Sequence, residues 1–151
     1  MAAQTVVRRN ADATATAVAL AATATGLVPR PSATAYTCEV YANKEWQDTG
    51  ISVIIGQRVS LVASGQWSHG LSESGGMYGP GGYDKYENAY LLPQARVGSL
   101  VGKIGLEPPF LIGTGTSFVA NVEGLLQLSM NDVPGSFYNN DGSVRVQIEV
   151  Q

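Results

Sequence analysis

The C-terminal segment of the chain reads Ser143-Val144-Arg145-Val146-Gln147-Ile148-Glu149-Val150. Apolar and polar residues alternate through it, so the two faces of an extended strand differ in character. Such alternation predicts an antiparallel strand with one face on a hydrophobic core and the other in water. The segment therefore indicates a layered β-protein.

Six other segments are short and rich in β-branched or aromatic residues, and Gly, Pro, Asn and Asp separate them. They are 37–42, 52–55, 58–63, 96–104, 117–120 and 125–130. No segment has sustained helical periodicity outside an Ala-rich N-terminal region. Short antiparallel strands with Gly/Pro turns are typical of a β-sandwich. We therefore expect an all-β fold.

The composition narrows the classes of function. The 151 residues include 9 Lys and Arg against 12 Asp and Glu, for a net charge of −3. The basic residues are scattered along the sequence, which argues against nucleic acid as a partner. No stretch is long and apolar enough to cross a bilayer, so we expect no transmembrane segment.

The chain has a single cysteine, Cys38, and so makes no internal disulfide. Its place in an apolar-alternating segment predicts a buried small hydrophobe rather than a reactive thiol. The absence of disulfides fits folding in the cytoplasm, with later release or action at the cell surface.

The segment before the last strand reads Asn131-Asp132-Val133-Pro134-Gly135-Ser136-Phe137-Tyr138-Asn139-Asn140-Asp141-Gly142. It gathers a carboxylate and adjacent carboxamides around a Pro-Gly turn, and calcium prefers such hard oxygen donors. Magnesium demands a stricter octahedron, and the sequence has no Cys/His cluster for zinc. The same residue types are also the commonest in ordinary turns, so a plain turn is the alternative.

The length of this loop favours a functional role. It joins the apolar segments 125–130 and 143–150, which we expect to pair as a hairpin. Hairpin connections usually have about 2 to 5 residues, and longer loops in compact domains tend to serve binding or catalysis.

At these residues the chain resembles the PA-I galactophilic lectins, the small calcium-dependent galactose-binding lectins of bacteria. Further segments occur in the same order and at similar separations as in that family: Cys38-Glu39-Val40-Tyr41-Ala42-Asn43, Leu61-Val62-Ala63-Ser64-Gly65, Tyr78-Gly79-Pro80 and Leu100-Val101-Gly102-Lys103-Ile104-Gly105. The resemblance covers residues 36–151, which we expect to form the lectin-like domain, and it is most specific in the loop 131–142. It implies a small jelly roll of two antiparallel four-stranded sheets that assembles as a homotetramer.

The resemblance also implies a Ca²⁺ site. Its ligands are the side chains of Asp132, Asn139 and Asn140 and the backbone carbonyls of Ser136 and His69. Ser136 and His69 stand where the family has Thr and Tyr, which a carbonyl ligand tolerates because it does not depend on residue type. Only Asp132 is charged, so the bound ion keeps a strong attraction for further oxygen atoms. In the family, two vicinal sugar hydroxyls supply them.

The same resemblance implies how the sugar is read. Asp132, Asn139 and the backbone around Val133 would bind the 3- and 4-hydroxyls and select a cis, galactose-like arrangement. We therefore expect galactose-containing glycans as partners.

A second loop, 71–90, completes the site in the family, and here the chain departs from the family pattern. The loop differs in length on both sides of Tyr78-Gly79-Pro80. The family's histidine at the sugar's 6-hydroxyl has no equivalent; Lys85 or Tyr86 falls nearest, and Asn88 replaces a Gln. We expect Lys85, Tyr86 and Asn88 to make the additional sugar contacts.

The sequence gives no indication of an enzyme. His69 is the only histidine and has no partner for a catalytic dyad. The stretch Gly79-Pro80-Gly81-Gly82 lacks the Lys and the helix of a phosphate-binding loop.

Residues 1–35 form an arm in which about half of the residues are Ala or Thr, a sharp change in composition. Three interpretations remain open. A signal peptide would use Arg8-Arg9 as its basic region. A cloning leader would explain Leu27-Val28-Pro29-Arg30, which resembles a thrombin site. The third is an extended strand, because Ala stands at every odd position over 11–21, and such a strand can add to a neighbouring subunit's sheet.

Two functions follow from these patterns. The first is a non-enzymatic, calcium-dependent lectin of galactose type. The second is a structural subunit of a filament, tube or crystal, built from the lectin fold and linked into a larger homo-oligomer by the arm 1–35.

Overall fold

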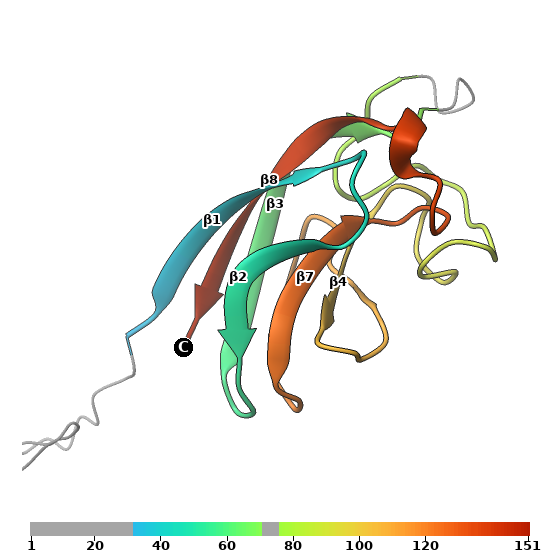
Figure 1. Cartoon of the computed structure of the whole chain (residues 1–151). Helices are drawn as coiled ribbons and strands as arrows, with labels where there is room; N and C mark the ends of the chain where they lie inside the picture. Colours follow the sequence, from blue (N-terminus) through green and yellow to red (C-terminus); the bar gives the residue numbers. More distant parts are fainter. Residues whose placement is uncertain (1–31, 71–75) are drawn as a thin grey trace, which may run out of the picture. The chain divides into compact units, whose positions relative to one another are not determined.

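The computed structural model describes residues 32–70 and 76–151. In these residues, strands and one short 3-10 helix follow one another along the chain, as Figure 1 shows. They are β1 (Thr34–Tyr41), β2 (Gln47–Val53), β3 (Arg58–Ser68), β4 (Leu100–Ile104), β5 (Phe110–Leu111), β6 (Gly115–Val119), β7 (Gly124–Met130), η2 (Phe137–Asn139) and β8 (Asp141–Val150). The described residues contain no helix with the length and apolar character that a bilayer crossing requires. The three interpretations of the arm concern residues that, up to position 31, lie outside the described ones.

The strands form two four-stranded sheets. One has the order β1-β8-β3-β6 and the other the order β2-β7-β4-β5. Every neighbouring pair is antiparallel. The expectation of an all-β sandwich of two antiparallel four-stranded sheets is confirmed.

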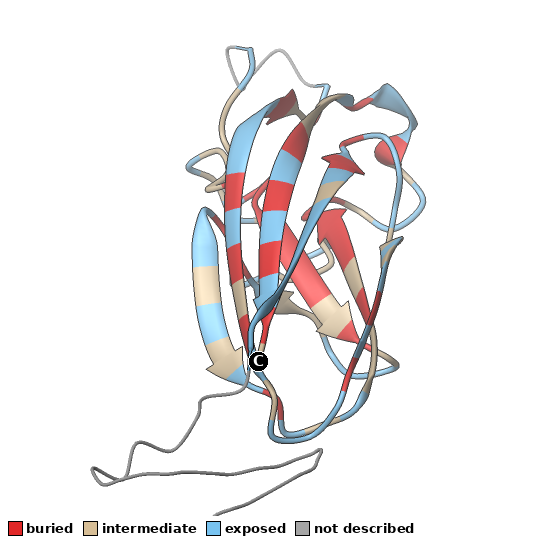
Figure 2. Cartoon of the chain, turned by 90° about the vertical axis from the view of Figure 1, so that its left-hand side faces the viewer, coloured by how far each residue is buried: buried red, intermediate tan, exposed pale blue. Residues whose placement is uncertain are grey.

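The core lies between the two sheets, and the last strand shows why. Along β8 the side chains of Val144, Val146 and Ile148 are fully buried, whereas Arg145 and Gln147 between them are exposed. Figure 2 shows the same alternation of buried and exposed bands along the strands. The facing sheet contributes Leu126 and Leu128 of β7, both at 0% exposure. The alternation expected for 143–150 is therefore confirmed.

Some strand bounds differ from the sequence-based expectation, each for a local reason. Strand β3 continues to Ser68, because Trp67 keeps the inward alternation across a Ser/Gly stretch that hides it in the sequence. Strand β4 begins only at Leu100, since the Ser99 N–H donates to the Arg96 carbonyl and Gly98 has a φ of +74°, which makes a turn. Strand β5 has two residues, too few for a pattern.

The expectation that segments 125–130 and 143–150 form a hairpin is wrong. Strand β7 pairs with β2 and β4, whereas β8 pairs with β1 and β3 in the other sheet. The loop between them therefore crosses from one sheet to the other, and packed sheets lie about 10 Å apart. That crossing explains its length and places it at one end of the sandwich.

Cys38 lies on the inward side of β1, opposite Val146 of β8, and is half-buried. Burial raises the pKa of its thiol, and the neighbouring charge of Glu39 raises it further. The thiolate is the reactive form, so both effects lower the reactivity of this cysteine at neutral pH.

We predict that Cys38 reacts with iodoacetamide more slowly than a cysteine in an unstructured peptide at the same neutral pH. The rate should rise with pH beyond the usual range of a thiol, and it should reach the peptide's rate in urea. Mass spectrometry of timed samples measures this. Equal rates for the folded protein and the peptide would contradict the burial of this side chain.

Candidate metal and ligand site

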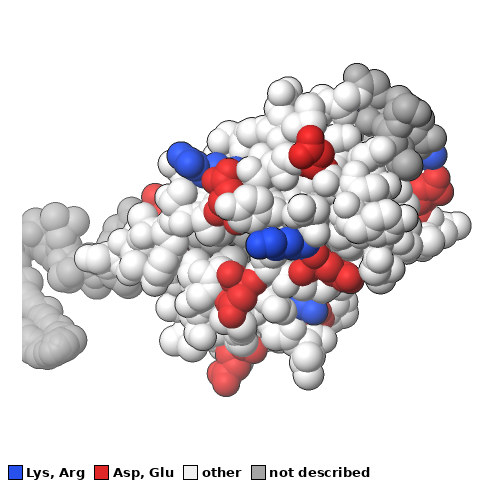
Figure 3. Space-filling view, turned by 45° about the horizontal axis from the view of Figure 1, so that its top comes forward, with Lys and Arg blue, Asp and Glu red and all other residues white. Residues whose placement is uncertain are grey.

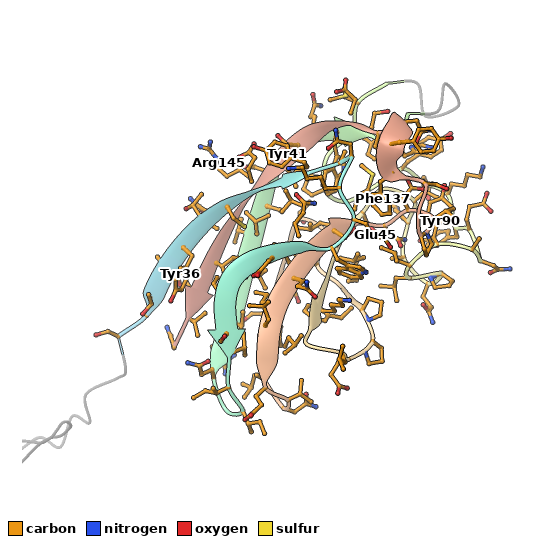
Figure 4. The ribbon with its side chains drawn as sticks, viewed as in Figure 1. Tyr36, Tyr41, Glu45, Tyr90, Phe137 and Arg145 are labelled. Atoms are coloured by element: carbon orange, nitrogen blue, oxygen red, sulfur yellow. The ribbon has the colours of Figure 1, made fainter. Side chains whose placement is uncertain are left out.

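The loop between β7 and β8 is built from two local turns. The Ser136 N–H donates to the Val133 carbonyl (3.0 Å), and Gly135 between them has a φ of +82°. Pro followed by a glycine of positive φ is the pattern of a type II turn. The helix η2 follows directly, and Phe137 at 5% exposure anchors it in the core. Figure 4 shows Phe137 at this end of the sandwich, with Glu45 and Tyr90 from two other segments.

A hydrogen bond between Asp132 and Asn140 closes the loop. The Asn140 Nδ2 donates to Asp132 Oδ2 (2.8 Å) and to the Ala42 carbonyl (2.9 Å). Asp132 Oδ1 accepts from the Val133 N–H (2.7 Å). Asp132 and Asn140 are 5% and 6% exposed. The structure therefore brings together two of the three side chains expected to bind a metal, in a buried position.

The second polar atom of the Asn140 amide is left without a partner. Its Nδ2 faces two oxygen acceptors, so the carbonyl oxygen Oδ1 must point the other way. Oδ1 is buried and accepts no hydrogen bond from any residue that the structure describes. A buried acceptor without a partner is unfavourable, and a cation beside it would remove that cost.

The carboxyl of Asp132 is also in an unfavourable position for an anion. Burial raises its pKa above the usual range. The hydrogen bonds from Asn140 and Val133 and the charge of His69 oppose this effect in part. A cation close to the carboxylate would stabilise its charged form.

The end of β3 lies beside the end of this loop, because β3 pairs with β8. Gly70 has a φ of +78°, and a Cβ at this position would lie 2.7 Å from the carbonyl carbon of Asn139. The backbone of residues 69–70 therefore packs directly on Asn139, the third expected side-chain ligand, which is itself exposed. His69, whose carbonyl is the expected ligand in this segment, is 2% exposed.

The Pro-Gly turn also positions Ser136 and Val133, the two remaining residues of the loop that we expect to contact the metal or the sugar. Ser136 is half-buried at the start of η2. Both backbone polar groups of Val133 are engaged within the loop, the N–H with Asp132 and the carbonyl with Ser136. A carbonyl has two lone pairs, so the Val133 oxygen keeps capacity for a further donor.

Residues 71–75 of the loop expected to complete the sugar site lie outside the described residues. Lys85 forms an ion pair with Glu87 (3.1 Å), and Tyr86 and Asn88 are exposed. Directly after this segment, the Leu91 N–H donates to the Asp132 carbonyl (3.0 Å). Among the described residues, no hydrogen bond or ion pair joins Tyr86 or Asn88 to Asp132, and their role as sugar contacts stays a prediction.

Sequence reasoning missed the role of Asn131. Its side chain is fully buried, accepts from the Leu92 N–H (2.8 Å) and donates to the carbonyls of Leu92 (3.0 Å), Ala95 (3.3 Å) and Arg96 (3.1 Å). It holds the segment 92–96 against the residue before Asp132. The only sign of this role in the sequence is that Asn131 directly precedes Asp132.

Two further residues near the loop were also missed. The Glu45 carboxylate accepts from the Gly135 N–H (3.2 Å) and so supports the Pro-Gly turn. The Tyr78 hydroxyl contacts both the backbone nitrogen and the ring of His69. Burial raises the pKa of Tyr78 far above its usual range, so this hydroxyl keeps its proton.

The surface carries charges of both signs. Figure 3 shows Lys and Arg interspersed with Asp and Glu on the face in view. Residues 32–70 and 76–151 contain no group of three or more His, Cys, Asp or Glu side chains placed to hold a metal. The expected ligand set does not need such a group, because it combines one carboxylate with amide and carbonyl oxygens.

One comparison with known proteins identifies a family, and another identifies the fold. A family model described as PA-IL-like protein matches residues 35–151. The structure is also similar to the solved structure of the EclA N-terminal domain, a PllA-like lectin, with a TM-score of 0.62 and 24% sequence identity. That match covers 77% of this chain and 96% of the other. At this identity the structural match shows the fold alone.

We predict that Asn131→Ala lowers the free energy of unfolding by at least about 2 kcal/mol, because it leaves the Leu92 N–H and the buried Ala95 carbonyl without their partner. Asn139→Ala is the matched control in the same loop. Its side chain is exposed, so without calcium it should change stability by less than about 0.5 kcal/mol. Urea unfolding of both variants in chelator measures the difference. Equal stability of the two variants would contradict the anchoring role of Asn131.

Proposed function

Because the chain belongs to the PA-IL-like family, a family of non-enzymatic carbohydrate-binding lectins, we propose that it binds galactose-containing glycans through a calcium ion in the loop 131–140. Lectins of this family typically bind calcium. The proposal for this chain concerns which residues hold the ion and which sugar it presents.

One observation carries the calcium proposal. Asn140 Oδ1 is buried without a hydrogen-bond partner among the described residues, and the same amide donates to the buried Asp132 carboxylate. A lone acceptor and a carboxylate with a raised pKa are each stabilised by a neighbouring cation. Asn140 and Asp132 would then be ligands, with their mutual hydrogen bond fixing the direction of the amide oxygen.

The remaining donors fit calcium by their chemistry. Asn139 offers a side-chain amide oxygen, and Ser136 and His69 offer backbone carbonyls, so every donor is a hard oxygen. Calcium accepts about 6 to 8 such oxygens in irregular geometry, whereas magnesium demands a near-ideal octahedron. The packing of residues 69–70 on Asn139 brings the end of β3 beside the start of β8, and the Asn140–Asp132 hydrogen bond adds the end of β7 from the other sheet.

The low charge of the proposed calcium ligands is the reason that we propose a sugar as the further ligand. Asp132 is the only anionic ligand, so a bound Ca²⁺ would keep a net positive charge and open positions for oxygen. Two vicinal hydroxyls of a sugar would fill those positions while accepting and donating hydrogen bonds with Asp132 and Asn139. A cis pair, as in the 3- and 4-hydroxyls of galactose, presents both oxygens on one side. Lys85, Tyr86 and Asn88 are proposed as outer contacts.

Calorimetric titration of sugars tests the proposal. Galactose should bind in calcium and fail to bind in chelator, and glucose, which differs at the 4-hydroxyl, should bind far more weakly in both. Galactose binding that is indifferent to chelation would exclude a calcium-mediated site. Equal binding of galactose and glucose would exclude the cis-diol selection while leaving the metal site in place.

We predict that Asp132→Ala loses calcium binding and galactose binding together, because the remaining donors are all neutral. Asp141→Ala, which removes the same charge from an exposed neighbouring residue, should keep both. A ligand that binds only the folded state stabilises it by about 2.7 kcal/mol at a hundredfold excess over Kd. Calcium should therefore raise the melting temperature of the wild type and of Asp141→Ala, and leave that of Asp132→Ala unchanged.

Each protein is compared with itself in chelator, so a change in intrinsic stability does not affect the result. A calcium-induced rise in Asp132→Ala equal to that of the wild type would place the metal elsewhere.

A further inference from the structure

We propose that the Tyr78 hydroxyl positions the backbone carbonyl of His69 for the metal ion. Tyr78 would then be a positioning residue of the calcium site, acting through His69 without touching the ion. This inference rests on the proposed function, because it assumes that the His69 carbonyl is a ligand.

The hydroxyl of Tyr78 holds His69 at two points. It lies 3.1 Å from the backbone nitrogen and 2.5 Å from the ring Nδ1 of the same residue. A backbone N–H only donates, so the hydroxyl oxygen accepts there, and the tautomer of the ring sets which atom donates in the bond with Nδ1. One hydroxyl therefore fixes both the peptide group between Ser68 and His69 and the rotamer of the His69 side chain.

His69 needs such a support because the sheet no longer provides one. The last pair of the β3–β8 ladder is Ser68 with Asp141, so His69 is the first residue beyond it. The next residue, Gly70, has a φ of +78° and lies against Asn139. The His69 carbonyl belongs to the peptide that joins His69 to Gly70, so its direction depends on how His69 is held.

Tyr78 is itself rigidly placed. Its backbone forms an antiparallel bridge with Trp67, with an N–H to O distance of 2.9 Å in each direction. Its ring packs on Gly98, where a Cβ would lie 2.7 Å from Cζ of the tyrosine. Gly98 in turn donates its N–H to the Asn131 carbonyl (2.9 Å). The hydroxyl is thus fixed to the same framework that carries Asp132.

This framework connects the two halves of the proposed ligand set. Asp132 follows β7 of one sheet, whereas Asn140 precedes β8 and His69 follows β3 in the other. A metal site requires its ligands to be placed within a few tenths of an ångström before the ion arrives. Tyr78 links His69 to Gly98 and Asn131, and so sets the position of one half relative to the other.

The test compares Tyr78→Phe with Tyr138→Phe. Both remove one hydroxyl, but Tyr138 is 84% exposed on the helix next to Asn139. Loss of an outer-shell partner typically weakens metal binding about 10-fold or more. We expect this weakening of calcium binding by calorimetry for Tyr78→Phe, and wild-type affinity for Tyr138→Phe.

A second readout separates positioning from a general loss of stability. Tb³⁺ replaces calcium in oxygen sites, and its luminescence lifetimes in H₂O and D₂O report the number of water molecules bound to the ion. If the His69 carbonyl is no longer aimed at the ion, a water takes its place, and the count rises by about one in Tyr78→Phe. It should stay at the wild-type value in Tyr138→Phe.

The possible results are distinct. A wild type that binds neither calcium nor Tb³⁺ overturns the proposed function. Wild-type affinity and water count in Tyr78→Phe overturn the positioning role alone. If Tyr78→Phe does not fold, the ¹³C resonance of the His69 carbonyl in the wild type decides. It must shift when calcium is added, and a resonance that does not move overturns the inference.

Discussion

The hydrogen bond from Asn140 to Asp132 is the contact on which the rest of the candidate site depends. Asp132 follows β7 of one sheet and Asn140 precedes β8 of the other, so this bond joins the sheets at one end of the sandwich. The same amide also holds the Ala42 carbonyl of the β1–β2 connection. With its nitrogen engaged twice, the amide has only one orientation, and its oxygen is left buried and available to a cation.

The fold follows from the sequence wherever the alternation of side chains is visible. In β8 the apolar residues alone define the inward face, and β7 repeats the pattern with Leu126 and Leu128. The sequence does not reveal which strands become neighbours, because pairing depends on contacts between distant segments. The hairpin expected of β7 and β8 failed for this reason: a long loop is equally compatible with a return in the same sheet and with a crossing to the other.

The candidate site was predictable to the extent that its residue types are distinctive. Asp132 and Asn140 stand out because a carboxylate and amides cluster around a Pro-Gly turn, and the structure joins them. The supporting contacts of Asn131 and Tyr78 were not predictable, since each binds backbone groups of a remote segment. Every residue has backbone polar groups, so the residue types do not show which of these groups will bind a distant side chain.

Anomalous X-ray diffraction from crystals grown with calcium or Tb³⁺ tests the central claim most directly. We predict a single strong peak between Asp132, Asn139 and Asn140, within ligand distance of the carbonyls of Ser136 and His69. At about 2.3 to 2.6 Å, these contacts would identify each oxygen ligand. A peak elsewhere, with the Asp132–Asn140 pair unchanged and no ion beside it, would contradict the account.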